Sequence, residues 1–125
     1  MNLVDSSGWL EYFADGDNAN FFAPAVEDIK NLIVPSICLY EVFKRILQQR
    51  TEDEALRAAA VMQQGRVVSL DPALSLEAAQ LSFSLKLPLA DSIILATAKA
   101  FGAIIWTQDA DFREMKNVRF VPAKK

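Results

Sequence analysis

The chain has 125 residues, 52% of them hydrophobic and 23% charged, which is enough for one compact domain and too short for two. It has no histidine and one cysteine, Cys38, which excludes histidine-activated nucleophiles, zinc sites built on imidazole or thiolate ligands, and an intramolecular disulfide. The formal net charge of -3 gives no sign of a nucleic-acid-binding protein. Any catalysis must therefore use carboxylates, hydroxyls, lysine or arginine, or a metal ion held by oxygen ligands.

Short apolar runs alternate with helical patterns, as in a parallel sheet covered by helices. The predicted elements, in chain order, are a strand at 2–4, helices at about 6–14 and 20–30, a strand at 32–34, helices at 37–49 and 52–65, a strand at 67–70, helices at 72–85 and 89–101, a strand at 103–107, a short helix at 110–115 and a strand at 118–121. No apolar run approaches the ~18 residues of a membrane span, and no targeting signal precedes the first strand. We therefore expect one cytoplasmic α/β domain over residues 1–125.

Side-chain caps are expected at four of the helix starts. The expected capping residues are Ser6 or Ser7, Ser36, Thr51 and Asp71. Asp71 is followed by proline, the residue favoured at the first helical position. The helix at 89–101 is apolar on almost every side, so we expect it to be buried.

Four of the sixteen acidic residues stand out by position: Asp5, Glu41, Asp91 and Asp109. Asp5 and Asp109 follow predicted strands, where open α/β sheets carry their ligand sites. Asp91 lies among apolar residues, where an unpaired carboxylate costs several kcal/mol unless it finds a partner, a proton or a cation. The ordinary alternative is a helix cap or turn for the three aspartates and an exposed pair with Arg45 for Glu41.

Taken together, these acids predict a metal site. Two acids at strand ends and two near helix starts can converge on one edge of a doubly wound sheet. Such a cluster cannot stay fully ionised without positive charge between its members. Without histidine or cysteine, the oxygen ligands suit Mg²⁺ or Mn²⁺.

Four segments carry a wider pattern across the whole chain. They are Leu3-Val4-Asp5-Ser6-Ser7-Gly8-Trp9, the helix of Glu41, the stretch from Leu87 to Ala98, and Thr107-Gln108-Asp109-Ala110-Asp111-Phe112. Together they resemble the PIN-domain ribonucleases, and among them the short VapC-type toxins of toxin-antitoxin pairs. The resemblance implies a three-layer α/β/α sandwich with a mostly parallel sheet of about five short strands. It also implies an Mg²⁺- or Mn²⁺-dependent endoribonuclease that cuts single-stranded RNA or an RNA loop, is inhibited by a small cognate antitoxin, and forms a homodimer.

The same resemblance assigns roles to individual residues. It makes Asp5, Glu41, Asp91 and Asp109 the metal-binding catalytic acids. Asp111 matches a neighbouring acid that not all members of the family carry. Thr107 matches a small hydroxyl residue that orients a metal-bound water. With Ser6, these two residues are further candidates for the site beyond the four acids. The hypothesis is that the metal activates water and stabilises the leaving 3′-oxygen, which gives 5′-phosphate and 3′-hydroxyl ends.

Substrate and partner surfaces are less defined by the sequence. Lys44, Arg45 and Lys86 are candidate contacts to RNA phosphates, with solvated helix faces as the alternative. Aromatic residues gather near the N-terminus, where they form either part of the core or a groove for the antitoxin. These residues are Trp9, Tyr12, Phe13, Phe21 and Phe22.

Three other functions compete with the toxin. One is a PIN nuclease of RNA processing that has no antitoxin. Another is a receiver-like domain that uses Mg²⁺ to accept a phosphoryl group on aspartate, although Asp5 is followed by two serines rather than by a second acid. The last is a PIN-like binding module without activity, which the complete acidic set argues against.

Overall fold

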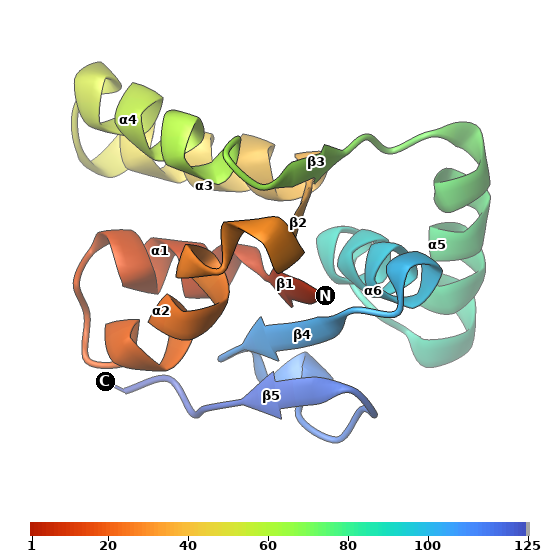
Figure 1. Cartoon of the computed structure of the whole chain (residues 1–125). Coiled ribbons are helices and arrows are strands. Elements are labelled where there is room, and N and C mark those ends of the chain that lie inside the picture. The colour runs from red at the N-terminus through yellow and green to blue at the C-terminus, as the bar shows by residue number, and fades with distance from the viewer. Residues whose placement is uncertain (125) are drawn as a thin grey trace.

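The computed structural model describes residues 1–124, in which five strands and six α-helices alternate (Figure 1). The strands are β1 (Asn2–Val4), β2 (Leu32–Pro35), β3 (Arg66–Val68), β4 (Ile104–Thr107) and β5 (Val118–Phe120). The helices are α1 (Ser6–Phe13), α2 (Ala19–Glu27), α3 (Ser36–Gln49), α4 (Glu52–Met62), α5 (Pro72–Leu85) and α6 (Leu89–Phe101), with 3₁₀ turns η1 (Ile29–Asn31) and η2 (Ala110–Phe112). No single helix among these residues could cross a membrane; α5 and α6 reach the necessary length only together and are bent by 117°.

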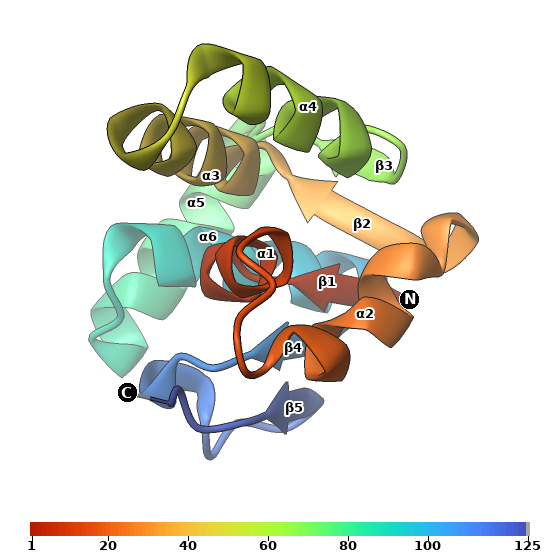
Figure 2. The same ribbon diagram turned by 90° about the vertical axis from the view of Figure 1, so that its left-hand side faces the viewer.

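All five strands are parallel, in the order β3-β2-β1-β4-β5. The chain runs outward from β1 to β3, then returns through α5 and α6 to β4 on the other side of β1. Because crossovers between parallel strands are right-handed, this reversal puts α1 to α4 on one face and α5 and α6 on the other. Figure 2 shows α1 and α2 in front of the sheet and α5 and α6 behind it. The three-layer α/β/α sandwich is confirmed, with its topological switch point between β1 and β4.

The core lies between the sheet and both helical layers. In α6 every residue from Ser92 to Ala98 is buried, which confirms the expectation for this helix. Trp9 and Phe22 are fully buried, and the remaining N-terminal aromatics pack against the same core. These side chains therefore serve the core, as the first of the two interpretations proposed.

Several predicted boundaries were wrong. Asp5, rather than Ser6 or Ser7, caps α1, because its carboxylate accepts a hydrogen bond from the Gly8 N–H at 2.9 Å. Ser36 makes no capping hydrogen bond at α3. The third strand ends at Val68 instead of residue 70, because its partner strand ends at Pro35 and leaves the next residues unpaired.

The remaining boundaries and caps differ less from expectation. The short helix at 110–115 is the single 3₁₀ turn η2. The caps at Thr51 and Asp71 are confirmed, since their side chains accept from Glu54 N and Leu74 N. Gly102 ends α6 with a φ of 60°, a left-handed conformation in which glycine carries no Cβ penalty.

Trp9 combines complete burial with an indole Nε1–H that has no hydrogen-bond partner within residues 1–124. We expect Trp9→Phe to change the free energy of unfolding by less than about 1.5 kcal/mol, because the lost contacts are offset by removal of an unsatisfied donor. Trp9→Ala should cost about 3–5 kcal/mol, since it leaves a cavity. Denaturant unfolding measures both, and equal costs for the two variants would contradict this account.

Candidate functional site

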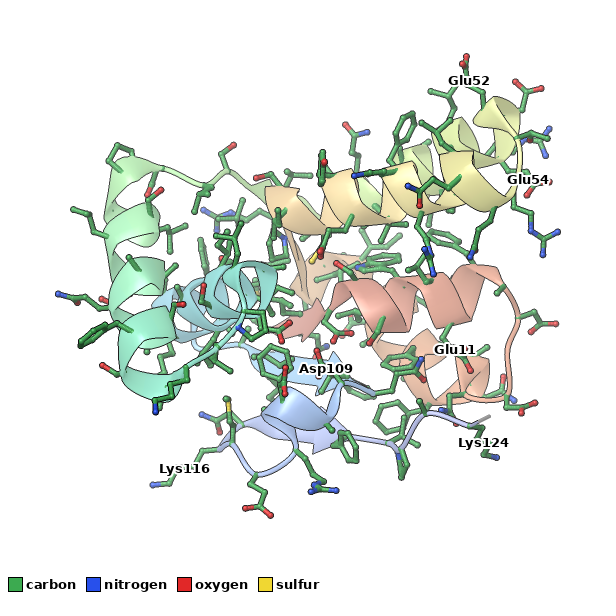
Figure 3. The ribbon with its side chains drawn as sticks, turned by 180° about the vertical axis from the view of Figure 1, so that it is seen from behind. Glu11, Glu52, Glu54, Asp109, Lys116 and Lys124 are labelled. Carbon is green, nitrogen blue, oxygen red and sulfur yellow. The ribbon has the colours of Figure 1, made fainter. Side chains whose placement is uncertain are left out.

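The predicted acids meet at the carboxyl edge of the sheet, at the switch point. Asp5 directly follows β1, and Asp109 lies two residues beyond β4. Asp91 is in the first turn of α6, and Glu41 is one turn into α3. Figure 3 shows Asp109 in the central part of the molecule beside the end of β4, whereas Glu52 and Glu54 extend outward from α4. Elements from both helical layers and from the middle of the sheet thus supply the site.

Three of these carboxylates form a tight cluster. One oxygen from each of Asp91, Asp109 and Asp111 lies within 4.8 Å of the other two. Burial raises the pKa of Asp91 to about 8, with further contributions from the charge of Asp109 and from hydrogen bonds with Asp111 and Asp109 that favour the protonated acid. Without a cation, this group therefore needs a proton to relieve the repulsion.

Asp5 is joined to this cluster through Thr107. The Thr107 hydroxyl, which is fully buried, donates to Asp5 Oδ2 and accepts from the backbone N–H of Asp109 at 2.8 Å. The other oxygen of Asp5 accepts from Ser7 Oγ at 2.8 Å. Burial nevertheless raises the pKa of Asp5 to about 6, because it outweighs these hydrogen bonds, and the Asp109 charge adds to the rise.

Glu41 is attached to the same region through Ser6, whose hydroxyl donates to Glu41 Oε1 at 2.6 Å. Cys38, one turn earlier in α3, is fully buried behind the acids. Burial raises the pKa of its thiol, and the charges of Asp5, Glu41 and Asp91 raise it further. The charges of three of the four predicted acids therefore act on the same buried thiol.

Comparison with known proteins identifies the fold family. The PIN domain family model matches residues 3–118. The chain belongs to the PIN domain family. No curated protein sequence matches it.

Solved structures share this PIN fold at low sequence identity. A toxin-antitoxin complex from Klebsiella pneumoniae is 21% identical, covering 95% of this chain and 96% of that chain with a TM-score of 0.81. VapC20 from Mycobacterium tuberculosis, a sarcin-ricin loop cleaving toxin, is 18% identical over 93% and 95% of the two chains, with a TM-score of 0.77. DNA-bound VapBC from Salmonella typhimurium is 14% identical over 98% of both, with a TM-score of 0.71.

The sequence also allowed the three aspartates to be helix caps or turn residues and Glu41 to form an exposed pair with Arg45, and the outcome differs from one position to the next. In this PIN domain Asp5 and Asp109 do cap α1 and η2, so they serve the backbone as well as the cluster. Asp91 is no cap, because Pro88 occupies that position, and it lies where the helix dipole favours negative charge. The side chain of Glu41 hydrogen-bonds with Ser6. One carboxylate, that of Asp109, therefore both caps a 3₁₀ turn and takes part in the acidic cluster.

The three candidate RNA contacts all have exposed side chains. Arg45 lines a cavity of about 570 Å³ together with Ser7 and Gln108, next to the acidic cluster. Lys44 lies over the Tyr40 ring, with its Nζ 5.5 Å from the ring centroid. Lys86 ends α5 in a left-handed conformation. Of the three, Arg45 is the one that lines a cavity with neighbours of the predicted acids, namely Ser7, which donates to Asp5, and Gln108, which precedes Asp109.

Sequence reasoning underrated some neighbours of the site. Asp111 is only a further candidate by sequence, outside the four main acids, yet it is one of the three clustered carboxylates. Ser7, expected only as a cap, donates to Asp5. The signal for Asp111 was its position two residues after Asp109, which the 3₁₀ turn brings back toward the same point, with Asp111 N–H donating to Asp109 Oδ1 at 2.9 Å.

Proposed function

We propose that this PIN domain is an Mg²⁺- or Mn²⁺-dependent endoribonuclease that acts in the cytoplasm as the toxin of a type II toxin-antitoxin pair. The observation that carries the proposal is the cluster of Asp91, Asp109 and Asp111 at the switch point of a parallel sheet, with Asp5 and Glu41 held beside it. Carboxylates packed this closely need a cation or a proton between them, and the chain offers no histidine or thiolate site that would select zinc.

The donor set fits a hard divalent ion. Its ligands would be oxygens of Asp91 and Asp109, with Asp111, Asp5 and Glu41 as further candidates. When bound, Mg²⁺ or Mn²⁺ would supply Lewis acidity toward water and the scissile phosphate. The Thr107 hydroxyl connects the Asp5 carboxylate to the Asp109 backbone by hydrogen bonds, and the Ser6 hydroxyl donates to Glu41. These hydrogen bonds therefore position the carboxylates of Asp5 and Glu41 without a bound ion.

RNA hydrolysis tests this proposal. Purified protein with Mn²⁺ or Mg²⁺ should cut single-stranded RNA internally and leave 5′-phosphate ends, and excess EDTA should stop the reaction. Asp71→Asn is the matched control, because Asp71 is an exposed helix cap outside the cluster and asparagine caps equally well. Cleavage that continues in EDTA would contradict the proposed metal dependence.

An antitoxin partner is supported by the neighbours, which include VapBC-1 from nontypeable Haemophilus influenzae and DNA-bound VapBC2 from Rickettsia felis. The main alternative is a PIN nuclease of RNA processing without an antitoxin. A gene for a short DNA-binding protein directly upstream, whose product binds this chain and blocks cleavage, would decide for the toxin. The strand order β3-β2-β1-β4-β5 argues against the receiver-like alternative, because receiver domains have the order 2-1-3-4-5.

A homodimer has a suitable surface on α5. This helix packs mainly on α6 and otherwise lies at the edge of the molecule (Figure 1). On α5, Phe83 is 88% exposed and Leu76 71% exposed, and Leu89 at the start of α6 is 74% exposed. Phe83 and Leu89 border a cavity of about 510 Å³ whose other lining residues are small, apolar or hydroxylic. A two-fold axis here would let Phe83 of each copy enter the cavity of the other.

The exposed area is adequate for this arrangement. Fully exposed large side chains offer on the order of 150–200 Å² each, so this face leaves roughly 400 Å² of apolar side-chain surface in water. That is about half of what one partner buries in an interface of standard size. No charged residue lines the cavity, so two identical copies would meet there without repulsion.

Phe83→Glu should therefore turn a dimer into a monomer, because it would bury an unpaired carboxylate in the uncharged cavity of each partner. Light scattering coupled to size exclusion measures the mass. Leu56→Glu on α4, where the leucine is 51% exposed, is the matched control and should remain dimeric. A wild-type monomer, or a dimer that withstands Phe83→Glu, would exclude this face.

A further inference from the structure

Gln108, the residue directly before Asp109, is held by a contact that spans most of the chain. Asn18 Nδ2 donates to Gln108 Oε1 at 3.0 Å and to the carbonyl oxygen of Pro122 at 3.0 Å. Asn18 is buried, and its backbone N–H donates to Glu11 Oε2 at 2.8 Å. This one side chain therefore ties the end of α1, the end of β4 and the segment after β5 together beside the acidic cluster.

These hydrogen bonds determine the orientation of the Gln108 side-chain amide, because they decide whether its oxygen or its NH₂ group faces Asn18. A backbone carbonyl such as that of Pro122 can only accept, so the atom of Asn18 that meets it must be the NH₂ group. The second hydrogen of the same group needs an acceptor, so Gln108 must turn its oxygen to Asn18. The two N–H donors of Gln108 Nε2 are then left over, and they have no acceptor within residues 1–124.

Gln108 lines the cavity of about 570 Å³. Ser7, which donates to Asp5, lines the same cavity, as does the exposed guanidinium of Arg45. Glu11 also lines it, but one of its oxygens is engaged by the Asn18 N–H. The cavity thus presents a neutral amide donor and the cations of Arg45 and Arg50, together with Glu54, and it reaches the clustered carboxylates through Ser7, which contacts Asp5, and Gln108, which precedes Asp109.

We propose that Gln108 donates a hydrogen bond from Nε2 to a phosphate oxygen of RNA bound in this cavity, and that Asn18 is the positioning residue that orients it. The inference rests on the proposed function, because it names a contact to the substrate of that nuclease. Glutamine and arginine are both common donors to phosphate. A neutral donor suits this place, because a lysine or arginine directly before Asp109 would compete with a metal ion for the carboxylates.

Two substitutions separate the donor from its surroundings. Gln108→Glu keeps an oxygen for Asn18 and replaces the NH₂ donors by a second oxygen, whereas Gln108→Met removes the donors without adding charge. Both should raise KM for a randomised single-stranded RNA by about 10-fold or more while kcat stays within about 3-fold, because the contact is made in both ground and transition states. The same change at exposed Gln64 is the matched control and should leave KM unaltered.

Asn18→Asp tests the orientation itself. A carboxylate at position 18 can only accept, so the Gln108 amide should turn its NH₂ inward, and KM should rise as in Gln108→Met although Gln108 is intact. The weakened RNA binding should also appear in fluorescence anisotropy without divalent cations. A rise in KM for Gln108→Glu alone would show a charge effect and overturn the inference, as would unchanged KM in both Gln108 variants. Wild-type protein that neither binds nor cuts RNA would overturn the proposed function as well.

Discussion

Asp91→Asn should abolish most RNA cleavage and at the same time make the metal-free protein more stable. The carboxylate of Asp91 lies within a few ångströms of two others, and its pKa is raised to about 8 by burial and by those neighbours. Asparagine removes the repulsion but also removes an anionic ligand. We expect the cleavage rate to fall by on the order of 10²–10³-fold.

The gain in stability expected for Asp91→Asn is limited by solvent screening. At pH 8 and without metal, the free energy of unfolding should rise by roughly 1–2 kcal/mol, well below the full value of the pKa shift, because Asp91 is partly exposed and solvent screens the repulsion. Denaturant unfolding in EDTA measures it. Asp71→Asn, an exposed cap, should change neither stability nor cleavage. An Asp91→Asn variant that cleaves RNA at the wild-type rate would remove Asp91 from the active site.

Divalent cations should stabilise the wild-type protein far more at pH 8 than at pH 5.5. The folded-state pKa values of Asp91 and Asp5 are raised to about 8 and about 6 from an ordinary 3.8. Between pH 4 and 8 the folded protein therefore holds more protons than the unfolded chain, and stability falls as the pH rises. A metal ion binds the ionised carboxylates. At pH 5.5 it must therefore compete with the protons bound there, whereas near pH 8 it replaces them easily.

Thermal unfolding provides the measurement. In EDTA the melting temperature should fall between pH 5.5 and pH 8, and Mn²⁺ at about 100 times its dissociation constant should raise it by roughly 10 °C at pH 8. The rise should be much smaller at pH 5.5 and in Asp91→Asn. A melting temperature in EDTA that increases from pH 5.5 to pH 8 would contradict the raised pKa values.

The sequence predicted those parts of the site that local rules govern. Asp5 and Asp109 could be found because each follows a short apolar strand, and the carboxyl ends of parallel strands share one edge. Asp91 could be found because a carboxylate in an apolar helix requires a partner. Fold class and strand number followed from the same alternation of apolar runs and helical patterns.

Contacts between distant segments could not be predicted. Asn18 meets Gln108 and Pro122 across separations of 90 and 104 residues, and no periodicity encodes such a pair. The end of β3 was missed for a related reason, because it depends on the length of β2. The sequence left the cap of α1 open between Asp5 and Ser6 or Ser7, because local preference ranks serine and aspartate alike, and only the structure shows Asp5 accepting from Gly8.

Anomalous diffraction from crystals grown with Mn²⁺ at pH 8 tests the central claim most directly. We predict a manganese peak among the carboxylates of Asp91, Asp109 and Asp111, with metal–oxygen distances of roughly 2.0–2.3 Å and with Asp5 or Glu41 in direct or water-mediated contact. The peak should be absent in Asp91→Asn. A wild-type crystal with saturating Mn²⁺ and no peak at this cluster, or a peak elsewhere only, would contradict the account.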